Sequence, residues 1–71
     1  MNVIVRTVYA VDNVETGMAA RIRRENRGLS LRLVAKRMGI SAMYLSHLER
    51  GKRAWTQARL DQFVNAVNRG G

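Results

Sequence analysis

The sequence predicts a mainly α fold: a compact domain of four short helices with an added N-terminal β-strand. Hydroxyl residues and glycines stand where helices should begin and end. Apolar residues recur between them at helical spacing. Only the segment before the first helix has the β-branched and aromatic composition of a strand. With 71 residues, the chain has room for one small core.

Residues 2–11 predict the strand, because they are dense in β-branched and aromatic side chains. No later segment has strand character, so the strand needs a partner from outside the chain. We therefore expect it to pair with the same strand of a second copy across a two-fold axis, through the face that carries Val3, Val5, Thr7 and Tyr9. The alternative is an extended arm that lies across the helices.

The first helix is predicted over residues 17–27, after a turn at residues 12–13. Thr16 could act as its N-cap. Met18 and Ile22 are four residues apart and therefore share one face of this helix.

Two short helices joined by a tight turn follow, over residues 31–38 and 42–50. Ser30 and Ser41 are placed as their N-caps. Gly39 ends the first of the two, because glycine takes a left-handed conformation without steric cost.

The last helix is predicted over residues 56–68, with Thr56 as its N-cap. Trp55 precedes it and is expected to cover the core, with a DNA or partner contact as the alternative. The apolar stripe of this helix consists of Leu60, Phe63, Val64 and Val67.

The formal charge of +8 points to a polyanionic partner, with nucleic acid ahead of an anionic membrane. Eleven of the thirteen cations are arginine, which suits contacts with phosphate and guanine. The alternative is that the positive charge serves only to keep the protein surface soluble. The chain has no cysteine and one histidine, so we expect neither a disulfide nor a structural metal, and no cofactor.

The two central helices and the residues after them resemble the Xre/Cro family of helix-turn-helix DNA-binding proteins, over about residues 18–68. This resemblance implies a compact four-helix helix-turn-helix domain of the lambda-repressor type. It is carried by Gly28-Leu29-Ser30, Val34-Ala35, Met38-Gly39-Ile40-Ser41, Leu45-Ser46 and, above all, Leu48-Glu49-Arg50-Gly51-Lys52-Arg53.

The resemblance also implies roles for individual residues. It makes residues 42–50 the recognition helix, and it pairs Arg24 with Glu49 as a structural ion pair. The side chains expected to read bases in the major groove are Ala42, Met43, Tyr44 and His47. Those expected to bind phosphate are Ser41, Ser46, Arg32, Arg37, Arg50, Lys52 and Arg53, although each alone could be a solvated surface residue.

The sequence departs from the family pattern at several positions. Leu31 stands where the family usually has glutamine, and Leu33 where it carries a polar residue. Both leucines suggest contact with the N-terminal strand or a partner subunit, unless they are scattered surface leucines. Ala20, rather than Ile22, falls in the usual apolar position of the first helix. The strand is expected to replace the family's fifth helix as the dimerising device.

These observations predict a sequence-specific regulator of transcription, a repressor or autoregulator, which binds a palindromic operator in double-stranded DNA as a homodimer. Residues 1–13 would be the dimerising arm and residues 14–71 the DNA-binding domain. The alternative is an antitoxin or interaction module that also binds a protein partner.

An enzyme is not expected, because no paired-carboxylate, Ser/His/Asp or metal constellation is present. The sequence has neither a membrane-length apolar run nor a signal-peptide pattern. We therefore expect no membrane partner, and a place in the cytoplasm of a bacterial or phage-infected cell, on the nucleoid.

Overall fold

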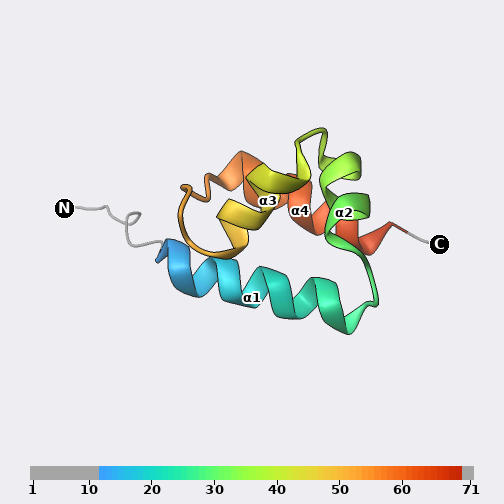
Figure 1. The fold of residues 1–71 in the computed structure, drawn as a ribbon, viewed down its shortest axis with the longest axis horizontal. Coiled ribbons are helices and arrows are strands. Elements are labelled where there is room, and N and C mark those ends of the chain that lie inside the picture. Colours follow the sequence, from blue (N-terminus) through green and yellow to red (C-terminus); the bar gives the residue numbers. More distant parts are fainter. Residues whose placement is uncertain (1–11, 70–71) are drawn as a thin grey trace.

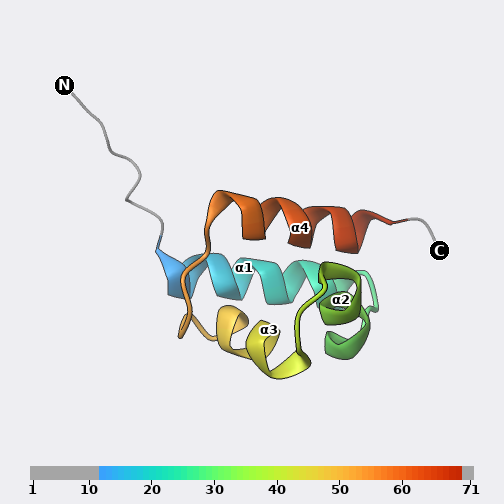
Figure 2. The same cartoon turned by 90° about the horizontal axis from the view of Figure 1, so that it is seen from above.

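Four α-helices make up the fold of residues 12–69, which are the residues that the computed structural model describes (Figure 1). Seen from above, α1 runs between α4 on one side and α2 with α3 on the other (Figure 2). The four helices are α1 (Asn13–Asn26), α2 (Leu31–Met38), α3 (Ala42–Glu49) and α4 (Gln57–Asn68).

The predicted fold class is wrong in one respect: residues 12–69 are all α and contain no strand. A strand needs a ladder partner, and every element described here is a helix whose backbone groups are already paired. The segment 2–11, to which the strand was assigned, lies outside the described residues, as do Val3, Val5, Thr7 and Tyr9. Dimerisation through a strand therefore loses its basis.

α1 begins at Asn13, four residues before the predicted start at Gly17. The side chain of Asp12 is the N-cap, and its Oδ1 accepts hydrogen bonds from the backbone N–H groups of Val14 at 2.9 Å and Glu15 at 3.1 Å. Aspartate is among the strongest N-cap residues. Thr16, the expected cap, lies within the helix instead.

Gly17 lies inside α1 because α3 passes directly over it. A Cβ atom at this position would lie 2.4 Å from the carbonyl oxygen of Leu48 and 2.6 Å from that of Glu49. Only glycine lets the two backbones come this close.

The other predicted caps are confirmed. The hydroxyl of Ser30 accepts from the N–H of Leu33 at 3.1 Å, and that of Ser41 from the N–H of Tyr44 at 3.0 Å. Thr56 caps α4 in the same way. Gly39 ends α2 in the left-handed conformation, with φ 76° and ψ 28°.

The core lies between the four helices, and Trp55 closes it, as predicted. Its ring meets that of Phe63 edge to face, with 5.7 Å between centroids and 87° between planes. Its indole N–H donates to the carbonyl oxygen of Leu48 at 2.9 Å, so its one polar atom is satisfied. The largest fully buried side chains are Phe63, Leu45, Leu48, Val34 and Val67.

The inward face of α1 follows the register that the family resemblance implied. Ala20 is 5% exposed, whereas Met18 and Ile22 are 58% and 52% exposed.

None of the helices in residues 12–69 has the length and apolar character needed to cross a membrane.

Candidate nucleic-acid interface

The turn between α2 and α3 sets the direction in which α3 leaves the domain. The left-handed Gly39 reverses the chain, and the N–H of Ile40 donates to the carbonyl oxygen of Ala35 at 3.0 Å. Ile40 is half-buried and packs against the core from within the turn. Ser41 then caps α3, so that both ends of the turn are held by local hydrogen bonds.

α3 divides sharply into a buried and an accessible side. Leu45, Leu48 and Glu49 face the core, and both leucines are 0% exposed. The four residues expected to read bases lie outside this buried set, and two of them, Ala42 and Tyr44, also pack in part against the core. Met43 is 70% exposed, and Ala42, Tyr44 and His47 are half-buried.

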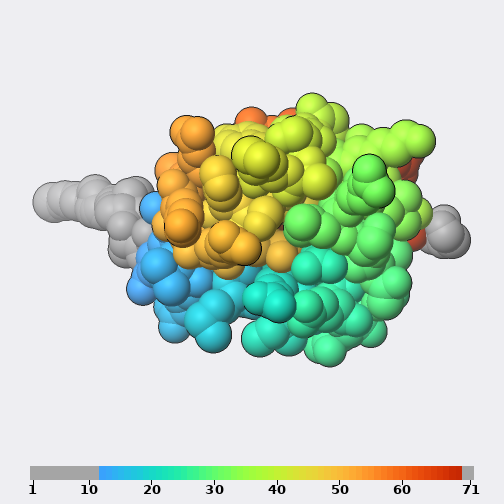
Figure 3. Space-filling view, viewed as in Figure 1, coloured from blue at the N-terminus to red at the C-terminus, as the bar shows by residue number. Residues whose placement is uncertain are grey.

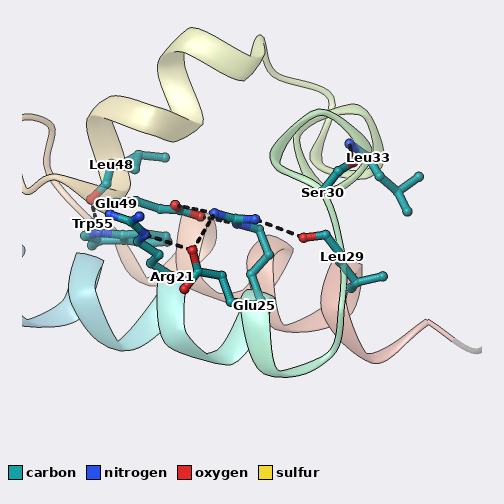
Figure 4. A network of polar contacts seen from close by, with 9 residues as sticks. Arg21, Glu25, Leu29, Ser30, Leu33, Leu48, Glu49 and Trp55 are labelled. Atoms are coloured by element: carbon teal, nitrogen blue, oxygen red, sulfur yellow. Dashed lines mark hydrogen bonds and ion pairs between the residues drawn. The ribbon is translucent and has the colours of Figure 1, made fainter.

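An ion pair between Arg24 of α1 and Glu49 of α3 anchors α3 from below (Figure 4). Nε of Arg24 donates to Oε2 of Glu49 at 2.7 Å, and Nη2 donates to Oε1 at 3.1 Å. Nη1 donates to the carbonyl oxygen of Leu29 at 2.9 Å. A bidentate pair of this kind holds both side chains in one geometry. These are the two residues that the sequence analysis paired.

The same contacts decide the protonation state of Arg24. Its hydrogen bonds to Glu49 raise the pKa of the guanidinium above the ordinary value, against the opposing effect of burial. The negative charges of Glu49 and Glu25 add to the rise. The hydrogen bonds to Glu49 thus favour the charged form of the Arg24 guanidinium.

Two arginines approach the ring of Tyr44. The guanidinium carbon of Arg59 is 5.1 Å from the centroid of the Tyr44 ring, and that of Arg53 is 5.8 Å away. Both distances suit a cation–π contact. Nη1 of Arg59 also donates to Oε1 of Gln62 at 2.8 Å.

Arg59 was missed in the sequence analysis. It belongs to the first turn of α4. It comes twelve residues after His47, which lies in the last turn of α3. No local pattern links these segments, so only the tertiary fold brings Arg59 to Tyr44.

Arg37 has a structural contact that the sequence did not predict. It is half-buried, and its Nη1 donates to the carbonyl oxygen of Ala66 at 2.9 Å. This hydrogen bond joins α2 to the last turns of α4. Arg32, on the same helix, is exposed.

The remaining candidates surround α3. Lys52 and Arg53 are exposed in the loop after α3. Ser46 and Arg50 share a cleft of about 180 Å³ with Leu31 of α2 and Arg21 of α1. Figure 3 shows α3 and the loop after it forming one continuous surface with α2. Ser41, Ser46, Arg50, Lys52 and Arg53 thus lie on α3 or directly beside its ends in the chain. Residues 12–69 hold no cluster of three or more metal-ligating side chains.

Comparisons with known proteins agree with this geometry. Residues 15–71 match the family described as "Helix-turn-helix domain". The structure is similar to that of the clp gene regulator ClgR from C. glutamicum, with a TM-score of 0.80 and 30% identity over 84% of this chain and 78% of that chain. It is also similar to the restriction-modification controller protein C.AhdI from Aeromonas hydrophila, with a TM-score of 0.76 and 28% identity over 89% of this chain and 90% of that chain. No protein of curated function matches the chain.

Proposed function

The chain belongs to the helix-turn-helix domain family, of the Xre/Cro type, and from this premise we propose that it is a transcription regulator that binds double-stranded DNA. One observation carries the proposal: a helix with two fully buried leucines carries on its other side Tyr44, whose ring is approached by Arg53 of the following loop and Arg59 of α4. That arrangement suits the major groove, whose walls are lined with phosphates. The similarity to a clp gene regulator and a restriction-modification controller protein supports the same role.

Base reading falls to the accessible residues of α3. Met43 is the most exposed of them and, with Ala42, can pack on thymine methyl groups. His47 can donate to or accept from a base edge. None of these side chains makes the bidentate contacts with which Arg, Asn and Gln select a base. We therefore expect a modest preference for the correct sequence, helped by the shape of the DNA.

Phosphate binding supplies most of the affinity. Arginine and lysine contacts with phosphate release counterions, so binding weakens steeply as salt rises. To the phosphate-binding residues predicted from the sequence we add Arg59, because its guanidinium group, like that of Arg53, lies over the Tyr44 ring. The proposed phosphate-binding residues are Ser41, Ser46, Arg32, Arg50, Lys52, Arg53 and Arg59. Arg37 is left out, because its guanidinium group donates to the carbonyl oxygen of Ala66 near the end of α4.

In biological terms we propose a repressor or autoregulator without enzymatic activity, acting in the cytoplasm as a homodimer on a palindromic operator. Two-fold symmetry in the protein would then match two-fold symmetry in the DNA, with half-sites about one helical turn apart. An inverted repeat upstream of the gene itself would support autoregulation.

The experiment that tests this function is a titration of the full chain with duplexes of mixed sequence at several salt concentrations. We expect Arg53→Ala to weaken binding to every duplex and to reduce the slope of log K against log salt by about 0.9, which corresponds to one lost phosphate contact. Arg69→Ala is the matched control, because Arg69 is exposed at the other end of α4.

The proposal fails if the unaltered protein forms no complex with any duplex at low salt. The assigned role of Arg53 fails if its variant loses affinity for only one operator base, or if Arg69→Ala has the same effect.

A further inference from the structure

Three large apolar side chains on one face of α1 are exposed in the part of the chain that the structure describes. Val14, Met18 and Ile22 follow one another at intervals of four residues, and each is more than half exposed. Residues four apart lie one above the other on a helix, so the three form a continuous row about 12 Å long. We call this row the α1 stripe. Neither the core nor the proposed DNA-binding residues include it.

The α1 stripe lies on the side of α1 away from α4. Gly17 marks the side that meets α3, since a Cβ atom there would contact the backbone of the last turn of α3. A helix turns by about 100° per residue, which places the α1 stripe between about 60° and 140° from Gly17. The buried Ala20, which borders Phe63 of α4, lies about 60° in the opposite direction. Figure 2 shows α4 along that other side of α1.

An apolar segment of the same chain directly precedes α1. Residues 2–11 come before the residues that the structure describes, and seven of these ten residues are apolar, while Arg6 is the one charged residue. At the other end of the described residues only Gly70 and Gly71 follow. The segment before α1 is therefore the one part of this chain outside residues 12–69 that has a run of apolar side chains to place on the α1 stripe.

We propose that residues 2–11 fold back at Asp12 and lie in extended form along the α1 stripe of the same chain. Aspartate favours the turn that this reversal needs. The segment contacts a helix and has no partner strand. The inference is independent of the proposed function, because no step in it involves DNA. The side chains that face the α1 stripe are Val3, Val5, Thr7 and Tyr9, which share one face of an extended chain.

The spacing of the two surfaces matches. Residues four apart on a helix are separated by about 6.0 Å along its axis, and residues two apart in an extended chain by about 6.6 Å. Counted from Asp12, Tyr9 lies about 10 Å back along the chain and Met18 about 9 Å along α1. Thr7 and Ile22 are level in the same way, at about 17 Å and 15 Å. Tyr9 thus meets Met18, and an aromatic ring against a thioether is a favourable contact.

Two further features favour this segment over a second copy or another protein. It is joined to α1 two residues before Val14, so its local concentration at the α1 stripe is in about the millimolar range. A contact within one chain also avoids the loss of translational freedom that association costs. The net charge of +8, by contrast, opposes the approach of a second copy.

A disulfide tests the position of the segment. The chain has no cysteine, so Tyr9→Cys/Met18→Cys introduces one pair of thiols. Ala19→Cys in place of Met18→Cys is the matched control, because Ala19 is exposed and adjacent but lies about 100° further around the helix. In glutathione buffers, we expect the first pair to close within one chain at an effective concentration about tenfold above that of the control pair. Mass spectrometry of dilute protein measures both.

Unfolding of the full chain tests the contact energetically. We expect Tyr9→Ser and Met18→Ser each to raise the equilibrium constant for unfolding about tenfold. The double variant should stay well below the product of the two effects, because both changes remove one contact. Met43→Ser is the matched control: Met43 is an exposed methionine of α3, and its effect should simply multiply with that of Tyr9→Ser.

Four outcomes would overturn the inference. Equal effective concentrations for the two thiol pairs would show that the segment does not lie on the α1 stripe. Disulfides between chains would assign the α1 stripe to a second copy. Single serine variants without effect on unfolding, or effects of Tyr9→Ser and Met18→Ser that multiply, would exclude the contact. DNA is absent from all these measurements, so a failure of the proposed function would leave their results unchanged.

Discussion

Among residues 12–69, Arg24 and Glu49 are the two buried charged residues, with exposures of 9% and 7%. Each satisfies the other, and Arg24 also uses its third donor on the carbonyl oxygen of Leu29. Removal of one partner leaves the other as an uncompensated buried charge, whereas removal of both does not. The pair thus makes the position of α3 on α1 dependent on both residues at once.

We expect Arg24→Met to lower the free energy of unfolding by about 3–5 kcal/mol. The double variant Arg24→Met/Glu49→Leu should lose clearly less, because no charge is left unpaired. Arg21→Met is the control, since the Arg21–Glu25 pair is exposed and contributes about 0–1 kcal/mol. Urea unfolding followed by circular dichroism measures all three. Equal losses for Arg24→Met and Arg21→Met would contradict this account.

Tyr44 can act through its ring or through its hydroxyl, and the structure favours the ring, which two guanidinium groups approach. We expect Tyr44→Phe to keep the affinity for mixed-sequence DNA nearly unchanged, because the phenyl ring still orders Arg53 and Arg59. Tyr44→Ala should weaken it severalfold, since each lost cation–π contact is worth about 0.5–1 kcal/mol. An equal fall in both variants, confined to one base position in a selection assay, would instead assign the hydroxyl to base reading.

α1 shows how the packing of one element overrides its local preferences. A glycine in the middle of a helix is unfavourable by about 1 kcal/mol relative to alanine, so propensity alone would end the helix near Gly17 or begin it there. The contact with the last turn of α3 reverses that preference, because no larger residue fits beneath the two carbonyl oxygens. Gly17 therefore belongs to the junction of α1 and α3 and does not mark a helix end.

Gly17→Ala tests the role of Gly17 in the close contact between α1 and α3. Propensity predicts a gain of about 1 kcal/mol in stability, but the clash with backbone atoms should instead give a loss of about 1–3 kcal/mol. Gly39→Ala provides the comparison, because Gly39 has a positive φ of 76° but nothing within 4 Å of the added Cβ. The Gly39→Ala variant should lose about 1–2 kcal/mol of stability, from backbone strain alone. A stabilised Gly17→Ala protein would disprove the close approach of α1 and α3.

The whole molecule combines a small core with a net charge of +8. The positive charges that attract phosphate also repel one another, so the free protein is destabilised by the same surface that would bind DNA. Salt screens both interactions, and at 0.1 M exposed charges more than about 10 Å apart scarcely interact. Stability of the free protein and affinity for DNA should therefore respond to salt in opposite directions.

We expect added sodium chloride to raise the Tm of the free protein while it weakens the DNA complex. For a domain of this size, a gain of 1 kcal/mol corresponds to a rise of about 4–8 °C. Thermal unfolding by circular dichroism and the titration described above give the two trends on one sample. If salt lowered the Tm instead, attractive surface ion pairs would outweigh the repulsion.

The sequence by itself determined the three later helices and their caps. Ser30, Ser41 and Thr56 each bond a backbone N–H three residues ahead, and such contacts depend only on neighbours along the chain. The match of the motif to a known family added the placement of α3 and the pairing of Arg24 with Glu49. Asp12 carries an equally local signal for the start of α1, but aspartate also favours turns, and the turn interpretation predicts a start four residues too late.

Only the tertiary structure decided which distant segments meet. It placed Arg59 on the Tyr44 ring, Arg37 on the carbonyl oxygen of Ala66, and Gly17 beneath α3. It also left an apolar groove between α1 and α4, which are far apart in the chain. Each contact depends on how close two helices pack and how they are rotated about their axes. Both quantities come from the shared core, so no local pattern in the sequence contains them.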